Sequence, residues 1–118
     1  SVREGMALGA GTARDGVRAV RAVRDTGGEY VLVSDDDVLS AMRDLARGAA
    51  VFAEPAGATA YAGLVKAARS GLANPDETIL VMNTGNGLKD VKSAMRAAGE
   101  AVRIEPELQA LKTHFQNL

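Results

Sequence analysis

The sequence contains no cysteine and no tryptophan, and its one histidine is His114. Without cysteine there is no disulfide framework or thiolate metal site, and a single histidine cannot form a histidine cluster, so we expect no metal site. Aromatic residues make up only 3% of the chain, and fourteen basic residues balance fifteen acidic ones. Because nucleic-acid binding needs a basic surface and often stacking aromatics, we expect no nucleic-acid partner.

Long apolar runs are also lacking. No stretch reaches 18 apolar residues, and the most apolar one, residues 57–65, is too short to span a bilayer. The chain opens at Ser1 without the basic-then-apolar pattern of a secretory signal. We therefore expect a cytoplasmic protein without membrane contact, and the start at Ser1 indicates a chain cut from something longer.

What is present is an ordinary globular composition, with 118 residues, 47% of them apolar and 25% charged, which is enough for one domain. Its organising stretch is the apolar run 78–82, which predicts a buried strand, followed by a turn that holds Thr84, Gly85, Asn86 and Gly87. Ligands of α/β sheets bind beyond the carboxyl ends of strands. Glycine there allows close backbone approach, and the Thr84 hydroxyl and Asn86 amide can both donate and accept hydrogen bonds.

Two common glycine motifs do not fit this turn. The dinucleotide fingerprint needs a third glycine where Asp90 stands, and the phosphate-binding P-loop needs four residues between its first glycine and Gly-Lys. A plain strand-to-helix turn remains an alternative reading, since glycine and asparagine are usual turn residues.

Upstream, the spacing of apolar residues predicts a helix over residues 13–25, a strand over 30–33 and a second helix that begins at Ser34. Ser34 and Asp37 fit a capping box, which explains the three consecutive aspartates better than a divalent-metal site does. The expected buried positions of the first helix are Ala13, Val17, Val20 and Val23. Those of the second are Val38, Leu39, Met42, Leu45 and Ala46, with Gly48 at its end.

Residues 54–68 differ in composition from the preceding segments, because they are mostly small and apolar. Pro55 suits the first turn of a helix over 56–68, whose small apolar residues predict burial on every side. Glu54 then enters a buried environment and needs a partner, either as a helix-capping carboxylate or as a carboxylate beside a cofactor. Further along we expect a turn at 74–76, a helix with Val91, Met95 and Ala98 on one face that ends at Gly99, and a short helix with Leu108, Leu111 and Phe115.

The two motifs together, Glu-Pro-Ala-Gly-Ala at 54–58 and Thr-Gly-Asn-Gly-Leu-Lys-Asp at 84–90, resemble the C-terminal part of the threonine synthases, a branch of the fold-type II pyridoxal-phosphate enzymes. The resemblance covers about half of the chain, residues 30–90. It implies an α/β fold in which residues 1–118 are a single C-terminal lobe, a fragment of a doubly wound, mostly parallel sheet with flanking helices. From the residues alone we expect strands 30–33 and 78–82 to be parallel neighbours joined by a right-handed crossover.

The resemblance also implies the chemistry. Pyridoxal phosphate is the expected cofactor, with Thr84 beside its pyridine nitrogen, Glu54 near the same ring, and Gly85 and Asn86 completing the site. The implied partner is a small-molecule amino-acid substrate, and the implied reaction converts O-phosphohomoserine and water to threonine and phosphate.

The chain departs from the family in one respect that matters. The Schiff-base lysine and the phosphate-binding turn of the family belong to N-terminal segments with no match here, and Lys66 and Lys89 are not substitutes for that lysine. We therefore expect no catalytic residue in this chain, no activity of the chain alone, and a partner in the form of the N-terminal lobe or a second copy in a homo-oligomer. A sister lyase of the threonine or serine dehydratase kind, and a stand-alone anion-binding α/β module, remain alternatives.

Overall fold

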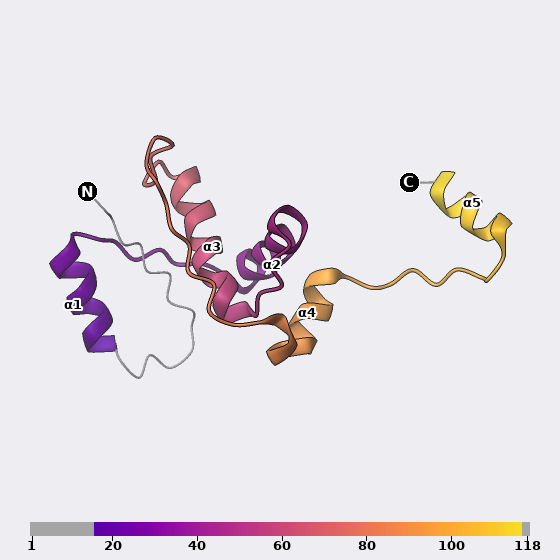
Figure 1. Cartoon of the computed structure of the whole chain (residues 1–118), viewed down its shortest axis with the longest axis horizontal. Helices are drawn as coiled ribbons and strands as arrows, with labels where there is room; N and C mark the ends of the chain where they lie inside the picture. Colours follow the sequence, from indigo (N-terminus) through magenta and orange to yellow (C-terminus); the bar gives the residue numbers. More distant parts are fainter. Residues whose placement is uncertain (1–15, 117–118) are drawn as a thin grey trace.

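The computed structural model describes residues 16–116, which form five α-helices and one 3-10 helix (Figure 1). In chain order these are α1 Gly16–Thr26, α2 Asp35–Ala49, α3 Pro55–Arg69, η1 Gly87–Asp90, α4 Val91–Ala98 and α5 Leu108–Gln116. Ala13, the first position of the predicted apolar stripe, lies outside the described residues. In Figure 1, α2, α3 and α4 lie together in the centre, and α1 and α5 lie toward opposite ends.

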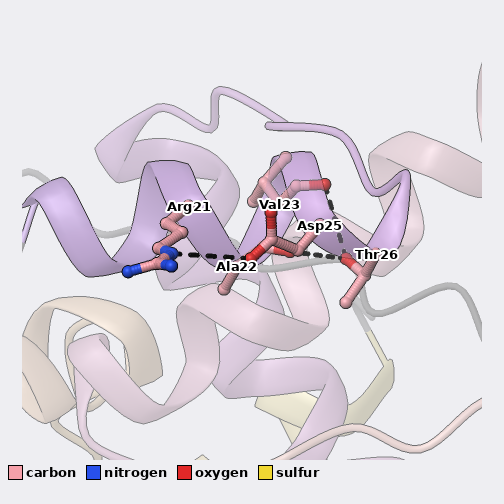
Figure 2. A network of polar contacts seen from close by, with 5 residues as sticks. All are labelled: Arg21, Ala22, Val23, Asp25 and Thr26. Carbon is pink, nitrogen blue, oxygen red and sulfur yellow. Dashed lines mark hydrogen bonds and ion pairs between the residues drawn. The ribbon is translucent and has the colours of Figure 1, made fainter.

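Helix α1 is held by contacts within its last turn and a half (Figure 2). The guanidinium of Arg21 lies 3.7 Å from the carboxylate of Asp25, and the Thr26 hydroxyl donates a hydrogen bond of 2.8 Å to the carbonyl of Ala22. Gly27 follows with a φ of 67°, a left-handed conformation that glycine adopts without strain. The helix thus ends at Thr26, one residue beyond the predicted boundary, and a glycine follows it.

The predicted apolar stripe of α1 is wrong at two of its described positions. Val17 is 85% exposed and Val20 is 49% exposed, whereas Ala19 and Val23 are buried. Valine and alanine alternate with arginine along this helix, so sequence spacing alone allowed more than one inward face.

Helix α2 begins with the predicted capping box. The backbone N–H of Asp37 donates to the Ser34 hydroxyl at 3.1 Å, and the Asp37 carboxylate accepts from the Ser34 backbone N–H at 2.8 Å. The carboxylate also accepts from the Ser34 hydroxyl at 2.9 Å, and the two bonds it accepts, from the backbone N–H and the hydroxyl of Ser34, hold the pKa of Asp37 below its usual value near 3.8. Capping is therefore confirmed as the use of this aspartate.

The core lies where α2 packs against α3 and α4. Leu39, expected in the stripe of α2, is only partly buried, and Ala46 is exposed, so the stripe is narrower than predicted. The buried residues of the core are Val38, Ala41, Met42, Leu45, Ala53, Ala58, Ala62 and Ala97. Apart from the residues of α2, these side chains are all alanine, which lets the backbones of the helices approach closely.

The end of α2 was predicted too early. The helix continues past Gly48 to Ala49, and Ala50 takes the left-handed conformation with a φ of 55°. The N–H of Val51 then bonds back to the carbonyl of Leu45 at 3.1 Å, which closes the helix end. A glycine one residue before the last residue of a helix thus did not mark its terminus.

Helix α3 starts at Pro55 as predicted. Its burial is one-sided, with Gly57, Ala58 and Thr59 buried while Ala56 is exposed, so burial on every side is wrong for this part of the chain. The predicted turn after α3 is confirmed, because the N–H of residue 76 bonds to the side chain of residue 74 at 3.0 Å. In Figure 1 the chain then runs back alongside α3 toward α4.

The predicted sheet is not confirmed, since residues 16–116 contain no β-strand. Residues 30–33 and 78–82 form no strand, and Leu32 and Leu80 are 84% and 87% exposed. A strand forms only where a neighbouring backbone pairs with its N–H and C=O groups. The burial predicted from the apolar character of these segments is therefore wrong for Leu32 and Leu80 within the described part of the chain.

Helix α4 ends at Gly99, as predicted, and α5 is present at the predicted place. The expected apolar face of α4 is wrong: Val91 is 51% exposed and Met95 68% exposed, while Ala97 is buried. Helix α5 buries none of its residues and lies beyond an extended segment in Figure 1. Every helix within the described range falls short of the length and apolarity needed to cross a membrane.

Candidate functional site

The two motifs that the sequence singled out meet through their backbones. An isolated antiparallel bridge joins Ala53 to Asn86. On one side of it the N–H of Glu54 donates to the carbonyl of Gly85 at 2.9 Å, and on the other the N–H of Gly87 donates to the carbonyl of Phe52 at 2.9 Å. Segments about thirty residues apart in sequence are therefore fixed against each other at the start of α3.

Glu54 occupies the N-cap position of α3 with an extended backbone, but its side chain makes no capping hydrogen bond. Its Oε1 instead accepts a hydrogen bond of 3.1 Å from Nζ of Lys89, and the Glu54 side chain is only 16% exposed. Helix capping by this carboxylate is therefore wrong, and the partner that burial demanded is a lysine of the second motif. The carboxylate still lies close to the electropositive start of α3.

Glycine lets the two segments approach closely where they cross. A Cβ on Gly85 would overlap the carboxyl group of Glu54. A Cβ on Gly57 would lie 3.2 Å from both the N and the O of Gly85, tighter than an ordinary contact. The Glu54 side chain thus occupies the space that a side chain at Gly85 would need, and the first turn of α3 packs against the Gly85 backbone.

Thr84 is exposed, and its hydroxyl has no hydrogen-bond partner among residues 16–116. It precedes Gly85 directly, so its backbone is fixed by the same crossing that holds Glu54. An exposed hydroxyl on a fixed backbone can donate one hydrogen bond and accept others from a ligand.

Asn86 has a structural use. Its side-chain oxygen accepts a hydrogen bond of 2.9 Å from the N–H of Leu88, which caps η1, and its backbone carbonyl accepts from the N–H of Lys89 at 3.1 Å. This short helix turns Lys89 back toward Glu54. The structure therefore brings Glu54, Gly85 and Asn86 together with Lys89, while the oxygen of Asn86 is engaged in the turn.

Beyond Lys89, Asp90 caps α4 through hydrogen bonds from the backbone N–H of Ser93 at 3.0 Å and its hydroxyl at 2.8 Å. These bonds lower the pKa of Asp90 below its usual value near 3.8. The whole stretch from the bridge at Asn86 to the start of α4 is therefore held by local hydrogen bonds.

Two residues of this site were missed from the sequence. Lys89 was noted only as a member of the second motif, and the aromatic ring of Phe52 lies where a Cβ on Gly87 would be. The signal that existed was the need of a half-buried carboxylate at position 54 for a partner. Which residue met that need depended on the crossing of the two segments, and the sequence did not fix that crossing.

Another surface groove lies between α2 and α4 and shares no residue with this crossing. Arg43 spans it, donating to the carbonyl of Ala97 at 3.1 Å and to the Ser40 hydroxyl at 2.8 Å. Because the bond to the Ala97 carbonyl links α2 to α4, the arginine has a structural use. No cluster of three His, Cys, Asp or Glu side chains suited to a metal ion occurs in the described part of the chain.

The sequence of the chain matches a known protein family. Residues 2–85 match the family model described as pyridoxal-phosphate dependent enzyme. The match covers most of the chain and takes in Glu54, Thr84 and Gly85, so the chain belongs to this family, whose members depend on pyridoxal phosphate.

Within that class the chain is similar to threonine synthases. It is 38% identical over 101 residues to the threonine synthase of Methanocaldococcus jannaschii. The aligned region covers 86% of this chain and 25% of that protein. The threonine synthase of Methanosarcina acetivorans is 32% identical over 106 residues, which make up 90% of this chain and 26% of that protein. The threonine synthase of a Bacillus species (strain ULM1) is 35% identical over 101 residues, which make up 85% of this chain and 29% of that protein. The chain thus spans about a quarter of the length of these curated relatives.

Proposed function

We propose that the intact protein containing this chain is a threonine synthase, which converts O-phosphohomoserine and water to threonine and phosphate. The observation that carries the proposal is the similarity to threonine synthases from archaea and bacteria over most of the chain, together with the family match. We also propose that this chain forms one wall of the cofactor site, built from Thr84, Glu54, Gly85 and Asn86.

The geometry of the crossing is compatible with a pyridine ring on its exposed side. Thr84 offers a hydroxyl that no residue in the described range uses, next to a backbone fixed by Glu54 and Gly85. When bound, pyridoxal phosphate withdraws electrons from the amino-acid substrate. A hydroxyl is a weaker partner for the ring nitrogen than a carboxylate, so Thr84 would temper that withdrawal, which suits elimination and replacement at the β and γ carbons.

Large uncovered apolar surfaces support a role as one part of a larger protein. The chain exposes 9362 Å², whereas a compact monomer of 12.2 kDa exposes roughly 6,000 Å². Leu32, Leu80 and Met82 are among the side chains left in solvent. We propose that the N-terminal lobe of the intact protein covers them, as the short span of the match to the relatives indicates, and that in isolation a second copy does so in a homo-oligomer.

The test compares the intact protein with the 118-residue chain, both supplied with pyridoxal phosphate and O-phosphohomoserine. We expect the intact protein to release threonine and phosphate and the chain alone to release neither. Release of a keto acid and ammonia from threonine or serine would favour a dehydratase instead. Threonine formed by the chain alone, with one lysine labelled after borohydride reduction and mapped by mass spectrometry, would contradict the proposed division between lobes.

Thr84 is tested separately in the intact protein. Replacing it by valine keeps the size and removes the hydroxyl, so turnover should fall by about tenfold or more while the melting temperature stays the same, whereas Thr84→Ser should keep most of the turnover. A factor of ten corresponds to about 1.4 kcal/mol, the order of one hydrogen bond to a ligand. Unchanged turnover and an unchanged cofactor absorption spectrum in Thr84→Val would show that the proposed role of this residue is wrong.

A further inference from the structure

One ion pair links the two motifs of the site. Lys89 Nζ lies 3.1 Å from Oε1 of Glu54, and the two residues are 35 positions apart. We propose that Lys89 is a positioning residue of the cofactor site: its ammonium group holds the Glu54 carboxylate against the backbone of Gly85, in the place from which Glu54 faces the cofactor. This inference rests on the proposed function, and it concerns a residue whose side chain does not itself touch the cofactor.

Glu54 has another position open to it. Its backbone sits at the N-cap of α3, where a side-chain oxygen ordinarily accepts from the N–H of the second or third residue of the helix. The structure shows no such bond, and Lys89 is the polar partner of the carboxylate within residues 16–116. Without Lys89 the carboxylate is free to rotate toward the helix end, since only its side-chain torsions hold it elsewhere.

Backbone hydrogen bonds fix both partners of the Glu54–Lys89 ion pair. The backbone N–H of Glu54 bonds to the Gly85 carbonyl at 2.9 Å, and the carboxyl group fills the space that a Cβ on Gly85 would need. On the other side, the Asn86 carbonyl accepts from the backbone N–H of Lys89 at 3.1 Å, so the lysine stands on a fixed turn. Two fixed backbones therefore leave the ion pair as the contact that sets the direction of the carboxylate.

We expect this ion pair to contribute little to the stability of the fold. The Lys89 side chain is 65% exposed and that of Glu54 only 16%, so one end of the pair is open to water. Ion pairs of this kind contribute little to folding, because water screens the attraction and ordering a long side chain costs entropy. The consequence of removing Lys89 should therefore appear in the cofactor site before it appears in the fold.

The experiment uses the intact protein and pyridoxal phosphate itself, with affinity measured by absorbance titration and stability by thermal melting. Lys89→Met should weaken cofactor affinity by about tenfold, the lower end of the loss seen when a residue that orients a ligand group is removed, with little change in melting temperature. Lys89→Arg should keep most of the affinity, because it still donates to the carboxylate. Lys112→Met, which removes the same charge from the exposed face of α5, is the matched control and should change neither quantity.

A charge exchange separates positioning from simple attachment. The double variant Glu54→Lys with Lys89→Glu can re-form the ion pair, so it should keep the melting temperature of the wild type while cofactor affinity stays low. Affinity restored by the exchange, or a Lys89→Met affinity equal to that of Lys112→Met, would overturn the inference and leave the proposed function standing. An intact wild-type protein that binds no pyridoxal phosphate would overturn the proposed function and this inference with it.

Discussion

Replacing Gly57 by alanine tests how closely the first turn of α3 packs beneath the second motif. Gly57 is buried, and a Cβ there would lie 3.2 Å from the N and O of Gly85 and 3.3 Å from Oδ1 of Asn83. Two of these three neighbours are backbone atoms held by the Glu54–Gly85 hydrogen bond, so they cannot simply rotate away. The added methyl group must push the two segments apart by a few tenths of an ångström.

Two opposing effects set the magnitude. Glycine to alanine within a helix gains about 0.5–1 kcal/mol, because alanine loses less backbone entropy on folding. Overpacking a tight contact costs about 1–3 kcal/mol. The balance is a net loss of about 1 kcal/mol for Gly57→Ala. Gly48→Ala in α2 is the matched control: nothing lies within 4 Å of its Cβ, so the helix gain should appear alone as an increase in stability.

The assay is urea denaturation of the 118-residue chain followed by circular dichroism, run on wild type and both variants. We expect the midpoint to fall for Gly57→Ala and to rise for Gly48→Ala. In the intact protein, Gly57→Ala should also weaken pyridoxal phosphate binding, because the displaced Gly85 carries Thr84 with it. If Gly57→Ala stabilised the chain as much as Gly48→Ala, the close crossing of α3 and the second motif would be refuted.

Two further variants test local features. Ala50→Gly should stabilise the chain by about 1 kcal/mol, because Ala50 has a φ of 55° and glycine reaches that conformation without strain; no rise in the denaturation midpoint would contradict the left-handed end of α2. The folded-state pKa of Asp37 lies below its usual value near 3.8, so its stabilisation of α2 is present above that pH and is lost as pH falls through the lowered pKa. Asp37→Asn can still cap but cannot titrate, so an acid titration of helix content should be flatter for this variant below pH 4, and identical curves would exclude the capping carboxylate as a source of the acid response.

Local signals predicted the helices well. Ser34 and Asp37 form their capping box, Pro55 begins α3, and Gly99 ends α4. Each of these features depends on residues within one turn of one another, which a sequence displays directly. Features that depend on distant neighbours were less certain, as Val17 and Met95 show, because several helix faces were apolar enough to be buried.

In the candidate site, too, the sequence predicted local features better than contacts between distant residues. Glu54, Thr84 and Gly85 were proposed from two short motifs, and the structure places both motifs at one crossing. Helix capping was a plausible use of the Glu54 carboxylate by position alone, and only the fold brings Lys89 within 3.1 Å of it. The predicted strands are absent for a related reason. A strand needs a neighbouring strand to pair with, and residues 16–116 supply none.

The bridge between Ala53 and Asn86 also determines where the length of the chain can vary. It closes residues 53–86 into a loop whose base holds the site, and whose far end is the exposed turn after α3 (Figure 1). Doubling the length of a flexible loop adds only about 0.6 kcal/mol to the cost of closing it. Insertions and deletions in the turn around Asn74 are therefore compatible with an unchanged base, so homologues of different length can share the same arrangement of Glu54 and Gly85.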